Sequence, residues 1–194
     1  MQFYFGHSMP RGVSQLFEQR AKEDGHQVIF DGMKTYASTE AFTDASGIGN
    51  RKGEPKVVFQ SMARANNLSA NDYATQLLIT GHTLKKYDPD APLWAVVPFG
   101  LFARQDQERE GLMDSVASEW FADALKHAGY SGVTTIEIHS DKAAQFFRDS
   151  FENDNFINID PSEIYEQDLH NMDLYNPVVV SPDKGANNRA DTLA

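Results

Sequence analysis

The sequence contains no cysteine among its 194 residues. Disulfide bonds, thiolate catalysis and cysteine-ligated zinc or iron–sulfur clusters are therefore excluded. Long hydrophobic runs are also missing, since no stretch approaches the roughly 18 apolar residues of a membrane-spanning helix. The first twelve residues, MQFYFGHSMPRG, lack the basic start and apolar core of a signal peptide. We therefore expect a soluble cytoplasmic protein without a membrane partner.

Positive charge is scarce, with 17 Lys and Arg against 28 Asp and Glu and a formal net charge of −11. A general surface for nucleic acid or anionic membranes depends on Lys and Arg that neutralise phosphates. We therefore expect no nucleic-acid partner, and any phosphate contact should be confined to a local pocket. The length is sufficient for one large domain or two small ones with a core that needs no covalent cross-links.

Short runs rich in strand-forming residues recur along the chain, at 2–5, 27–30, 56–61, 93–99, 133–139 and 177–183. Apolar spacing between them predicts helices over 70–86 and 113–128, the second capped by Asp114 or Ser115 and ending at Gly129. Strands that alternate with helices indicate βαβ units. The predicted fold class is α/β, a doubly wound and mostly parallel sheet with helices on both faces.

Two segments interrupt this alternation. Residues 39–55 are rich in Gly, Thr, Asn and charge, which indicates a hairpin connection or a mobile loop. Residues 153–163 form an acidic, Asn-rich turn in which Pro161 can open a helix. We predict a first domain over 1–155 and the start of a second, truncated domain of the same type over 156–194. A complete doubly wound domain would need several more strands after the run at 177–181.

Polar side chains follow three of the predicted strands, and ligands of such sheets bind beyond the carboxyl ends of the strands. Arg104 offers a planar fork of donors to phosphate oxygens. His139 offers an imidazole nitrogen to a metal or a phosphate, and Glu137 lies two residues earlier on the same predicted strand face. Asp183 heads a Pro-Asp-Lys-Gly turn whose N–H groups can form an anion nest while its carboxylate reaches Mg²⁺.

Each of these residues also has a purely structural interpretation. Arg104 can be a solvated loop residue that pairs with Asp106 or Glu108. His139 can be a hydrogen-bonded histidine at a strand end, and Asp183 can serve only to form its turn. The coincidence of phosphate- or metal-compatible groups at three separate strand ends favours the functional interpretation.

The segment VVPFGLFARQDQ, 96–107, resembles the V-I-P-Y-x-x-Y-A-R-Q-D motif of ribose-phosphate diphosphokinases, also called phosphoribosyl pyrophosphate synthetases. Four further segments resemble landmarks of the same family in the same order. They are FYFGHSMPRGVSQLFEQRA at 3–21, VVFQSMARANNLSANDYATQLLI at 57–79, VTTIEIHSDKAAQFF at 133–147 and VVVSPDKGANNRADTLA at 178–194. The resemblance covers almost the whole chain and corresponds to roughly the first two-thirds of such an enzyme.

The resemblance implies a phosphoribosyltransferase-like fold and a kinase-type transferase of nucleotide biosynthesis. Its reaction is transfer of the β,γ-diphosphoryl group of ATP to the C1 hydroxyl of ribose 5-phosphate, with Mg²⁺ as cofactor. Positioning and charge neutralisation supply most of the catalysis in phosphoryl transfer. By position, the resemblance assigns ATP binding to Arg104, Gln105 and Asp106. It assigns the metal to His139 and Asp183, with Glu137 where the family usually has Asp.

The segment TYASTEAF, 35–42, aligns with the family's R-F-S-D-G-E-V. In the family this segment lends an aromatic face and polar contacts to adenine bound by a neighbouring subunit. The resemblance therefore assigns Tyr36, Ser38 and Glu40 to ATP binding, although Ser38 replaces Asp or Asn, and it implies a homo-oligomer.

One landmark of the family has no counterpart in the sequence. The phosphoribosyl-binding motif D-D-x-x-x-T-G-G-T does not occur, and the chain contains no Asp-Asp pair. The catalytic Lys and Arg of the family's mobile loop would lie beyond Ala194, so no catalytic residue is assigned. We expect the ribose 5-phosphate site to be mostly absent and this chain to be inactive by itself. The alternatives are a non-catalytic nucleotide-binding or regulatory subunit of the family, or a phosphoribosyltransferase-like domain with another acceptor.

Overall fold

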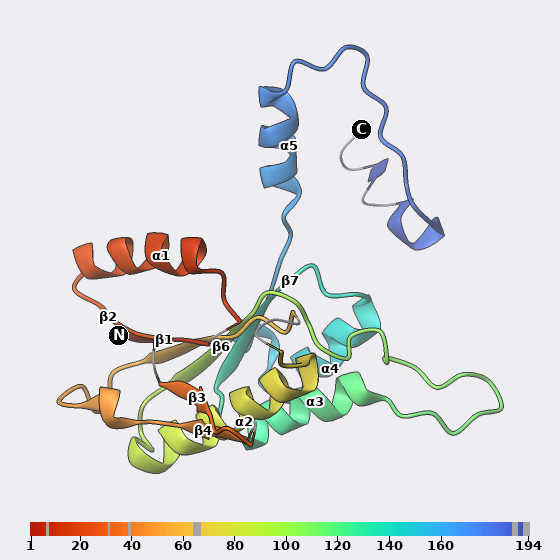
Figure 1. The fold of residues 1–194 in the computed structure, drawn as a ribbon. Coiled ribbons are helices and arrows are strands. Elements are labelled where there is room, and N and C mark those ends of the chain that lie inside the picture. The colour runs from red at the N-terminus through yellow and green to blue at the C-terminus, as the bar shows by residue number, and fades with distance from the viewer. Residues whose placement is uncertain (7, 31, 39, 64–66, 188–189, 192–194) are drawn as a thin grey trace. The chain divides into compact units, whose positions relative to one another are not determined.

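The computed structural model describes residues 1–6, 8–30, 32–38, 40–63, 67–187 and 190–191 (Figure 1). The chain divides into two compact units, Met1–Asn158 and Ile159–Ala194. The first unit contains the strands that form the main sheet and most of the helices. In the described parts of the chain, none of the helices has the length and apolarity needed to cross a bilayer.

A six-stranded sheet forms the centre of the first unit, in the order β2-β1-β5-β6-β7-β8. The pairings of β1 with β2 and β5, of β5 with β6 and of β6 with β7 are all parallel. The strands are β1 Gln2–Phe5, β2 Gln27–Ile29, β5 Lys56–Phe59, β6 Leu93–Val97, β7 Gly132–Ile136 and β8 Phe156–Ile159. The predicted α/β class with a mostly parallel sheet is confirmed.

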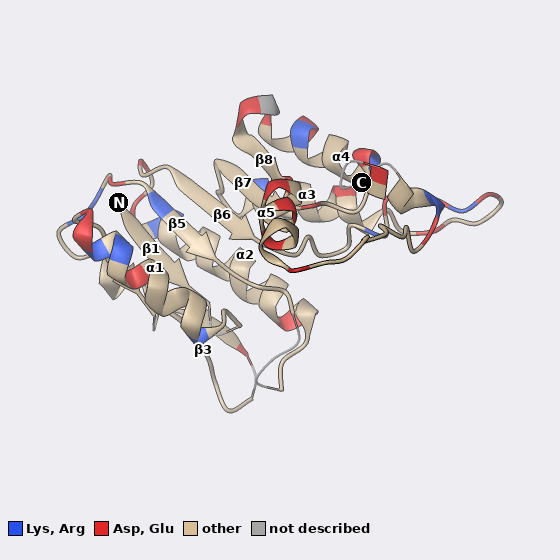
Figure 2. Cartoon of the chain, turned by 90° about the horizontal axis from the view of Figure 1, so that it is seen from above, with Lys and Arg blue, Asp and Glu red and all other residues tan. Residues whose placement is uncertain are grey.

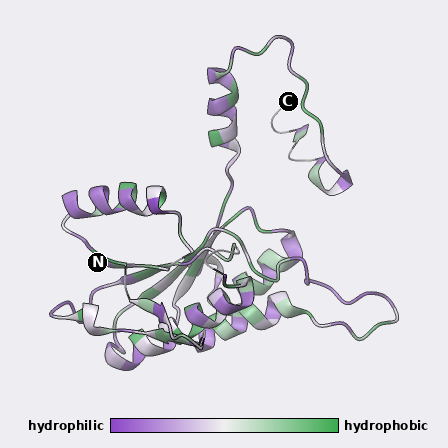
Figure 3. Cartoon of the chain, viewed as in Figure 1, coloured by the Kyte–Doolittle hydropathy of each residue, from purple (hydrophilic) through white to green (hydrophobic). Residues whose placement is uncertain are grey.

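Helices cover both faces of this sheet (Figure 1). In β1 the side chains alternate, so Tyr4 enters the larger core while Phe3 and Phe5 point to the opposite face. On that face they pack against α1, and the larger core lies under α2, α3 and α4. The helices are α1 Arg11–Glu23, α2 Ala70–Tyr87, α3 Ala117–His127 and α4 Asp141–Phe151. Figure 3 shows α1 as mostly hydrophilic with a few apolar positions, of which Phe17 and Ala21 belong to the smaller core.

A small antiparallel hairpin, β3 Met33–Thr35 and β4 Ala41–Thr43, packs against α2. The Thr43 and Thr80 hydroxyls lie 2.8 Å apart, and the Gln76 side-chain amide donates to the Lys34 carbonyl at 3.2 Å. Residues 39–55, predicted as a hairpin connection or a mobile loop, contain β4 of this hairpin and the short 3₁₀ helix Ser46–Ile48.

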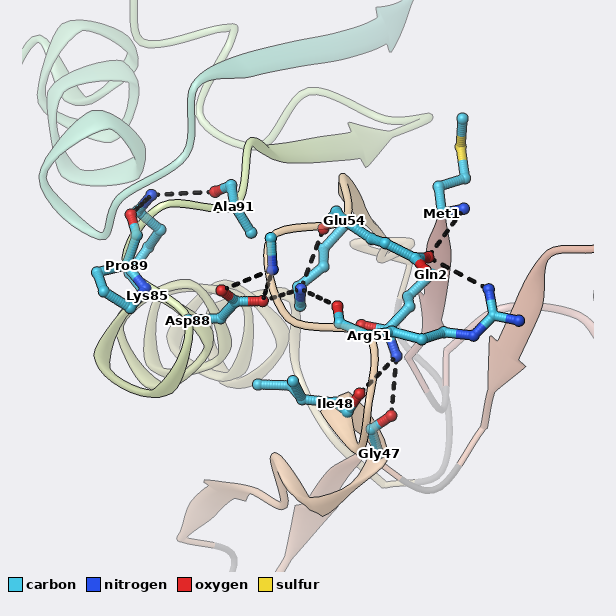
Figure 4. A network of polar contacts seen from close by, with 12 residues as sticks. Met1, Gln2, Gly47, Ile48, Arg51, Glu54, Lys85, Asp88, Pro89 and Ala91 are labelled. Carbon is cyan, nitrogen blue, oxygen red and sulfur yellow. Dashed lines mark hydrogen bonds and ion pairs between the residues drawn. The ribbon is translucent and has the colours of Figure 1, made fainter.

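A network of polar contacts fixes the amino-terminal ends of β1 and β5 (Figure 4). Lys56 and Asp88 form a buried ion pair, with side chains 1% and 5% exposed. The Gly53 N–H lies 3.0 and 2.9 Å from the two carboxylate oxygens of Asp88. The Gln2 amide donates to the Gly47 carbonyl at 2.9 Å. These contacts tie the segment before β5 to the end of α2.

Several predicted elements are shorter or placed differently in the structure. The strands predicted at 56–61, 93–99 and 133–139 end at Phe59, Val97 and Ile136. The pairing of β5 with β6 ends at Phe59, and that of β6 with β7 ends at Val97 and Thr135. The helix predicted over 113–128 begins at Ala117 with Val116 at the N-cap position, because Asp114 binds Arg109 and caps nothing. The prediction that Asp114 or Ser115 caps this helix was wrong.

Two predictions near the end of the chain were also wrong. The segment taken as a turn, 153–163, contains β8, which adds to the edge of the sheet. The run predicted as a strand at 177–183 contains no strand, and Val178 and Val180 are 79% and 78% exposed. A strand is defined by pairing with a neighbour, and the described residues provide none for this run. Pro161 does precede a helix, α5 Ser162–Asn171.

Candidate functional site

The loop after β6 holds its backbone firmly while it exposes Arg104. Leu101 and Ala103 are buried, and the Gln105 N–H donates to the Phe102 carbonyl at 2.7 Å. Phe102 adopts the left-handed backbone conformation, with a φ of 62°. Arg104 lies inside this tight turn, and its side chain is exposed. The loop therefore presents a guanidinium group on a fixed stretch of backbone.

The next two residues attach the loop to two helices. The Gln105 carbonyl accepts a hydrogen bond from the Ser118 N–H in the first turn of α3, at 3.2 Å. The Gln105 side chain is exposed and accepts from the Ser115 hydroxyl at 3.3 Å. Asp106 is only 8% exposed and accepts a hydrogen bond from the Ser140 hydroxyl at the start of α4. Asp106 therefore faces α4 and not the solvent.

The two arginines of this region differ in their partners. Arg109 forms two hydrogen bonds to Asp114, from Nε to Oδ2 at 2.6 Å and from one terminal nitrogen to Oδ1 at 3.0 Å. This bonding holds the pKa of Asp114 below its usual value. Among the residues that the structure describes, Arg104 has no ion pair with Asp106, Glu108 or any other carboxylate. The exposure of Arg104 is compatible with a ligand role and with a solvated loop residue, so its role stays a prediction.

The loop after β7 lies at the same edge of the sheet as the loop after β6, because the two strands are parallel neighbours. Glu137 has a φ of 47° and is half-buried, and His139 is exposed. Between them, the buried Ile138 donates its N–H to the Asn158 side chain at 3.0 Å. Both predicted ligands lie beyond the last residue of β7. The argument that strand alternation puts them on one face therefore does not apply.

The third predicted strand end belongs to the second unit. Asp183 is exposed and caps a short 3₁₀ helix, Lys184–Ala186, accepting from the Ala186 N–H at 3.1 Å. The Ser181 hydroxyl donates to the Asp183 carbonyl at 2.6 Å. Asp183 thus forms a turn, as its structural interpretation predicts. In the described parts of the chain, no three or more His, Asp or Glu residues are grouped so that they could hold a metal.

The residues assigned to adenine lie on the β3–β4 hairpin. The Tyr36 N–H donates to the Glu40 carbonyl at 2.9 Å, and the Ser38 hydroxyl donates to the Glu40 carboxylate at 2.6 Å. Tyr36 stacks on Phe42 with ring centroids 4.4 Å apart, and it remains exposed. The hairpin brings these three residues together at its tip, with an aromatic ring and polar groups open to solvent.

Sequence reasoning did not single out Ser140, although it links two candidate loops. Its side chain accepts from the Ala143 N–H at 3.0 Å and so caps α4, while its hydroxyl donates to Asp106. The signal was present as a Ser directly before the helical segment DKAAQFF.

Two cavities of about 440 and 560 Å³ lie away from these loops. The first is lined by residues of 43–52 with Tyr87, and the second by residues of α2 and α3 with Ala128. Neither cavity contains a predicted site residue, so we base the candidate site on the loops at the carboxyl edge of the sheet.

Charge is mixed over the first unit, with Lys and Arg interspersed among Asp and Glu on α1 (Figure 2). Three ion pairs link side chains of α1 and its C-cap residue Asp24, each between residues three or four positions apart. Arg20 and Lys22 are therefore paired locally with acidic residues.

Comparison with known proteins gives a consistent group of relatives. The chain is 32% identical over 124 residues to the ribose-phosphate pyrophosphokinase of Aquifex aeolicus, covering 64% of this chain and 38% of the relative. It is 28% identical over 145 residues to the enzyme of that name from Buchnera aphidicola, covering 75% and 43%. It is 29% identical over 150 residues to that of Ralstonia nicotianae, covering 73% and 46%. The matches therefore span about two-fifths of the length of these curated relatives.

A solved structure agrees with the sequence relatives. The phosphoribosylpyrophosphate synthetase of Mycobacterium smegmatis superposes with a TM-score of 0.77 at 26% identity, over 99% of this chain and 59% of that one. No family model matches the chain. The resemblance to ribose-phosphate pyrophosphokinases that the motifs predicted is confirmed by these similarities in sequence and fold.

Proposed function

We propose, from this relationship to ribose-phosphate pyrophosphokinases, that the chain binds Mg²⁺–ATP at the loop after β6. The reaction that this binding serves is transfer of diphosphate from ATP to ribose 5-phosphate, giving phosphoribosyl pyrophosphate. The observation that carries the proposal is the state of Arg104. Its guanidinium is exposed and free of carboxylate partners among the described residues, on an anchored loop at the carboxyl edge of a mostly parallel sheet.

The geometry suits the triphosphate of a nucleotide. A guanidinium donates two parallel hydrogen bonds to phosphate oxygens, and such charge-assisted bonds are about twice as strong as neutral ones. Since hydrogen bonds of the Gln105 backbone already hold the loop beside Arg104, binding has less backbone to order. Gln105, which is also exposed, offers amide donors directly beside it. Tyr36, Ser38 and Glu40 would contact adenine bound by a neighbouring copy.

The residues present fit a metal that arrives with the nucleotide. Mg²⁺ in such sites is held by one or two protein groups, with phosphates and water completing its shell. In the first unit the chain offers the exposed His139 and, as a further candidate, Glu137. Asp183 belongs to the second unit and is proposed as a ligand from the family resemblance alone. When bound, Mg²⁺ would neutralise phosphate charge during the transfer. The task of the chain's own residues is to position the phosphates and to balance their remaining charge through Arg104.

A motif for binding ribose 5-phosphate is not found in the sequence. The sequence has no D-D-x-x-x-T-G-G-T motif, which the family resemblance links to ribose-phosphate binding. We therefore propose that this chain alone turns over negligibly. We also propose that the chain has two domains, 1–155 and 156–194, and that it is cytoplasmic.

A coupled assay for AMP release tests the reaction. The 194-residue chain is incubated with Mg²⁺–ATP with and without ribose 5-phosphate, and ATP binding is measured by equilibrium dialysis in parallel. We expect ATP binding with negligible release of AMP. Robust release that depends on ribose 5-phosphate would show that this chain contains a complete site. Absence of both binding and release would contradict the proposed function.

A further inference from the structure

We propose that Asp106 is a positioning residue, which with Ser140 forms a latch between the two loops of the candidate site. The inference rests on the proposed function and adds a role for a contact within that site. The latch consists of the hydrogen bond from the Ser140 hydroxyl to the Asp106 carboxylate, which joins residues 34 positions apart.

Burial sets Asp106 apart from its polar neighbours. In the stretch 104–110 it is the only buried residue, while the six others, all described, are exposed. A buried carboxylate is costly unless hydrogen bonds satisfy it. The Ser140 hydroxyl supplies such a bond. The start of α4, where the positive end of the helix dipole lies, adds a favourable field for a negative charge.

Ser140 serves both partners at once. The Ser140 oxygen accepts a hydrogen bond from the Ala143 N–H at 3.0 Å, as an N-cap residue does. The Ser140 hydroxyl donates a hydrogen bond to the Asp106 carboxylate. The three groups form one chain of hydrogen bonds from the backbone of α4 to the loop after β6. Such a chain fixes the direction of each bond, because the serine hydroxyl has a single proton to donate.

The latch holds both proposed ligand residues through their backbones. Arg104 lies two positions before Asp106, and His139 directly precedes Ser140. On its other side the loop after β6 is held by the bond between the Gln105 carbonyl and the Ser118 N–H. The latch therefore sets how far the Arg104 backbone lies from the His139 backbone, so both can meet one triphosphate. Asp106 acts here through its neighbours and needs no contact with the nucleotide.

Four variants of the full chain and one control separate positioning from direct contact. Asp106→Ala and Ser140→Gly each remove the latch, and Gly at an N-cap costs only a few tenths of a kcal/mol. The double variant removes both partners, and Ser140→Thr keeps the hydroxyl. The control is Ser150→Ala, because Ser150 makes a matching bond to Asp123 at 2.7 Å between α4 and α3, away from the loops. Hydrogen exchange of the ligand-free chain is measured first, and Mg²⁺–ATP affinity by calorimetry second.

In ligand-free protein, amides of 103–106 and 140–143 should exchange about tenfold faster in Asp106→Ala and in Ser140→Gly, the loss expected for one charge-assisted bond. Affinity for Mg²⁺–ATP should fall about tenfold in each single variant and no further in the double variant, since the two residues act as one unit. Ser140→Thr should retain the parent's behaviour, and Ser150→Ala should change neither measurement. If Asp106→Ala does not fold, the pair Ser140→Gly and Ser140→Thr still decides the question.

Other outcomes overturn the latch. A loss of affinity in Asp106→Ala with none in Ser140→Gly would mean that Asp106 touches the nucleotide directly. Additive losses, unchanged exchange, or unchanged affinity in every variant would each contradict positioning. If the parent chain does not bind Mg²⁺–ATP, the proposed function is wrong. The exchange measurement then decides by itself whether the two loops are latched.

Discussion

At the scale of single residues, the buried ion pair between Lys56 and Asp88 has the largest expected effect on stability. Both side chains are almost fully buried, and Asp88 also accepts from the Gly53 N–H. Burial acts to raise the pKa of Asp88. Hydrogen bonds from Lys56 and Gly53, with the charges of Lys56 and Lys52, outweigh that effect and hold the pKa below its usual value. The carboxylate is therefore charged in the folded protein at neutral pH.

Asp88→Asn should lower the free energy of unfolding by about 3–5 kcal/mol, because it leaves the Lys56 ammonium buried without its counter-charge. Urea denaturation at neutral pH gives the value. Asp90→Asn, the same change at an exposed position two residues later, should stay within about 0.5 kcal/mol of the parent. Equal losses in the two variants would show that the ion pair does not stabilise the fold.

The ion pair between Lys56 and Asp88 also predicts that the stability of the folded protein falls at acid pH. The folded pKa of Asp88 lies below its unfolded value of about 3.9, so the stabilisation is present above that pH and is lost as pH falls through the folded pKa. Between neutral pH and strong acid, the parent should therefore lose more stability than Asp88→Asn. Parallel acid-unfolding slopes for the two proteins would contradict this account.

Single residues also show where sequence reasoning reached its limit. Arg104 was predicted to bind phosphate from its residue type and its place after a strand; the structure shows that it is exposed, and its role stays a prediction. The partner of Asp106 was not predictable, because Ser140 lies 34 positions away and meets it only through the sheet. The pairing of Arg109 with Asp114 was missed because Asp114 looked equally suitable as a helix cap.

At the scale of elements, strands and helices with a strong periodic pattern were predicted and those that depend on neighbours were not. Helix α2 was predicted over 70–86 and spans Ala70–Tyr87, since its apolar stripe and its Ser69 cap are both local. The edge strand β8 has only four residues and follows an Asn-rich turn, so its local signal was weak. The Val178–Val180 run was predicted as a strand because its residues have a strong strand propensity. It forms no strand, since the described residues offer it no neighbouring strand.

The turn from β1 into α1 gives a prediction at this scale. A Cβ atom on Gly6 would lie 1.5 Å from Oε1 of Gln60, at the end of β5. Gln60 is fully buried, and its amide nitrogen donates to the Ser8 hydroxyl at 2.9 Å, so the side chain cannot move without losing that bond. Gly6→Ala should therefore destabilise the protein by about 1–3 kcal/mol, the usual cost of overpacking.

Gly12, in the first turn of α1, provides the matched control. A Cβ there meets nothing within 4 Å. Gly12→Ala should raise the free energy of unfolding by up to about 1 kcal/mol, because alanine loses less backbone entropy in a helix. Thermal unfolding of both variants tests the pair. A stable Gly6→Ala protein would show that the ends of β1 and β5 are less tightly packed than described.

At the scale of the whole molecule, the exposed hairpin predicts self-association. Tyr36, Ser38 and Glu40 present an aromatic ring and polar groups to solvent, as a contribution to a neighbour's site would require. We expect sedimentation at micromolar concentration to show at least a dimer, weakened in Tyr36→Ala. Tyr87→Ala, at an equally exposed tyrosine of α2, should leave association unchanged. A parent chain that is monomeric with and without ATP would make the hairpin residues ordinary surface positions.

The central claim is that this acidic chain binds nucleotide phosphate through one exposed arginine. Calorimetric titration of Mg²⁺–ATP into the parent, Arg104→Lys and Arg109→Lys tests it most directly, because both substitutions keep the charge and lie in the same loop region. Arg104→Lys loses the planar fork and should weaken binding by about 1–3 kcal/mol. Arg109→Lys should bind as the parent does, since its guanidinium is occupied by Asp114. Equal losses from the two substitutions, or none from either, would contradict the assignment of Arg104.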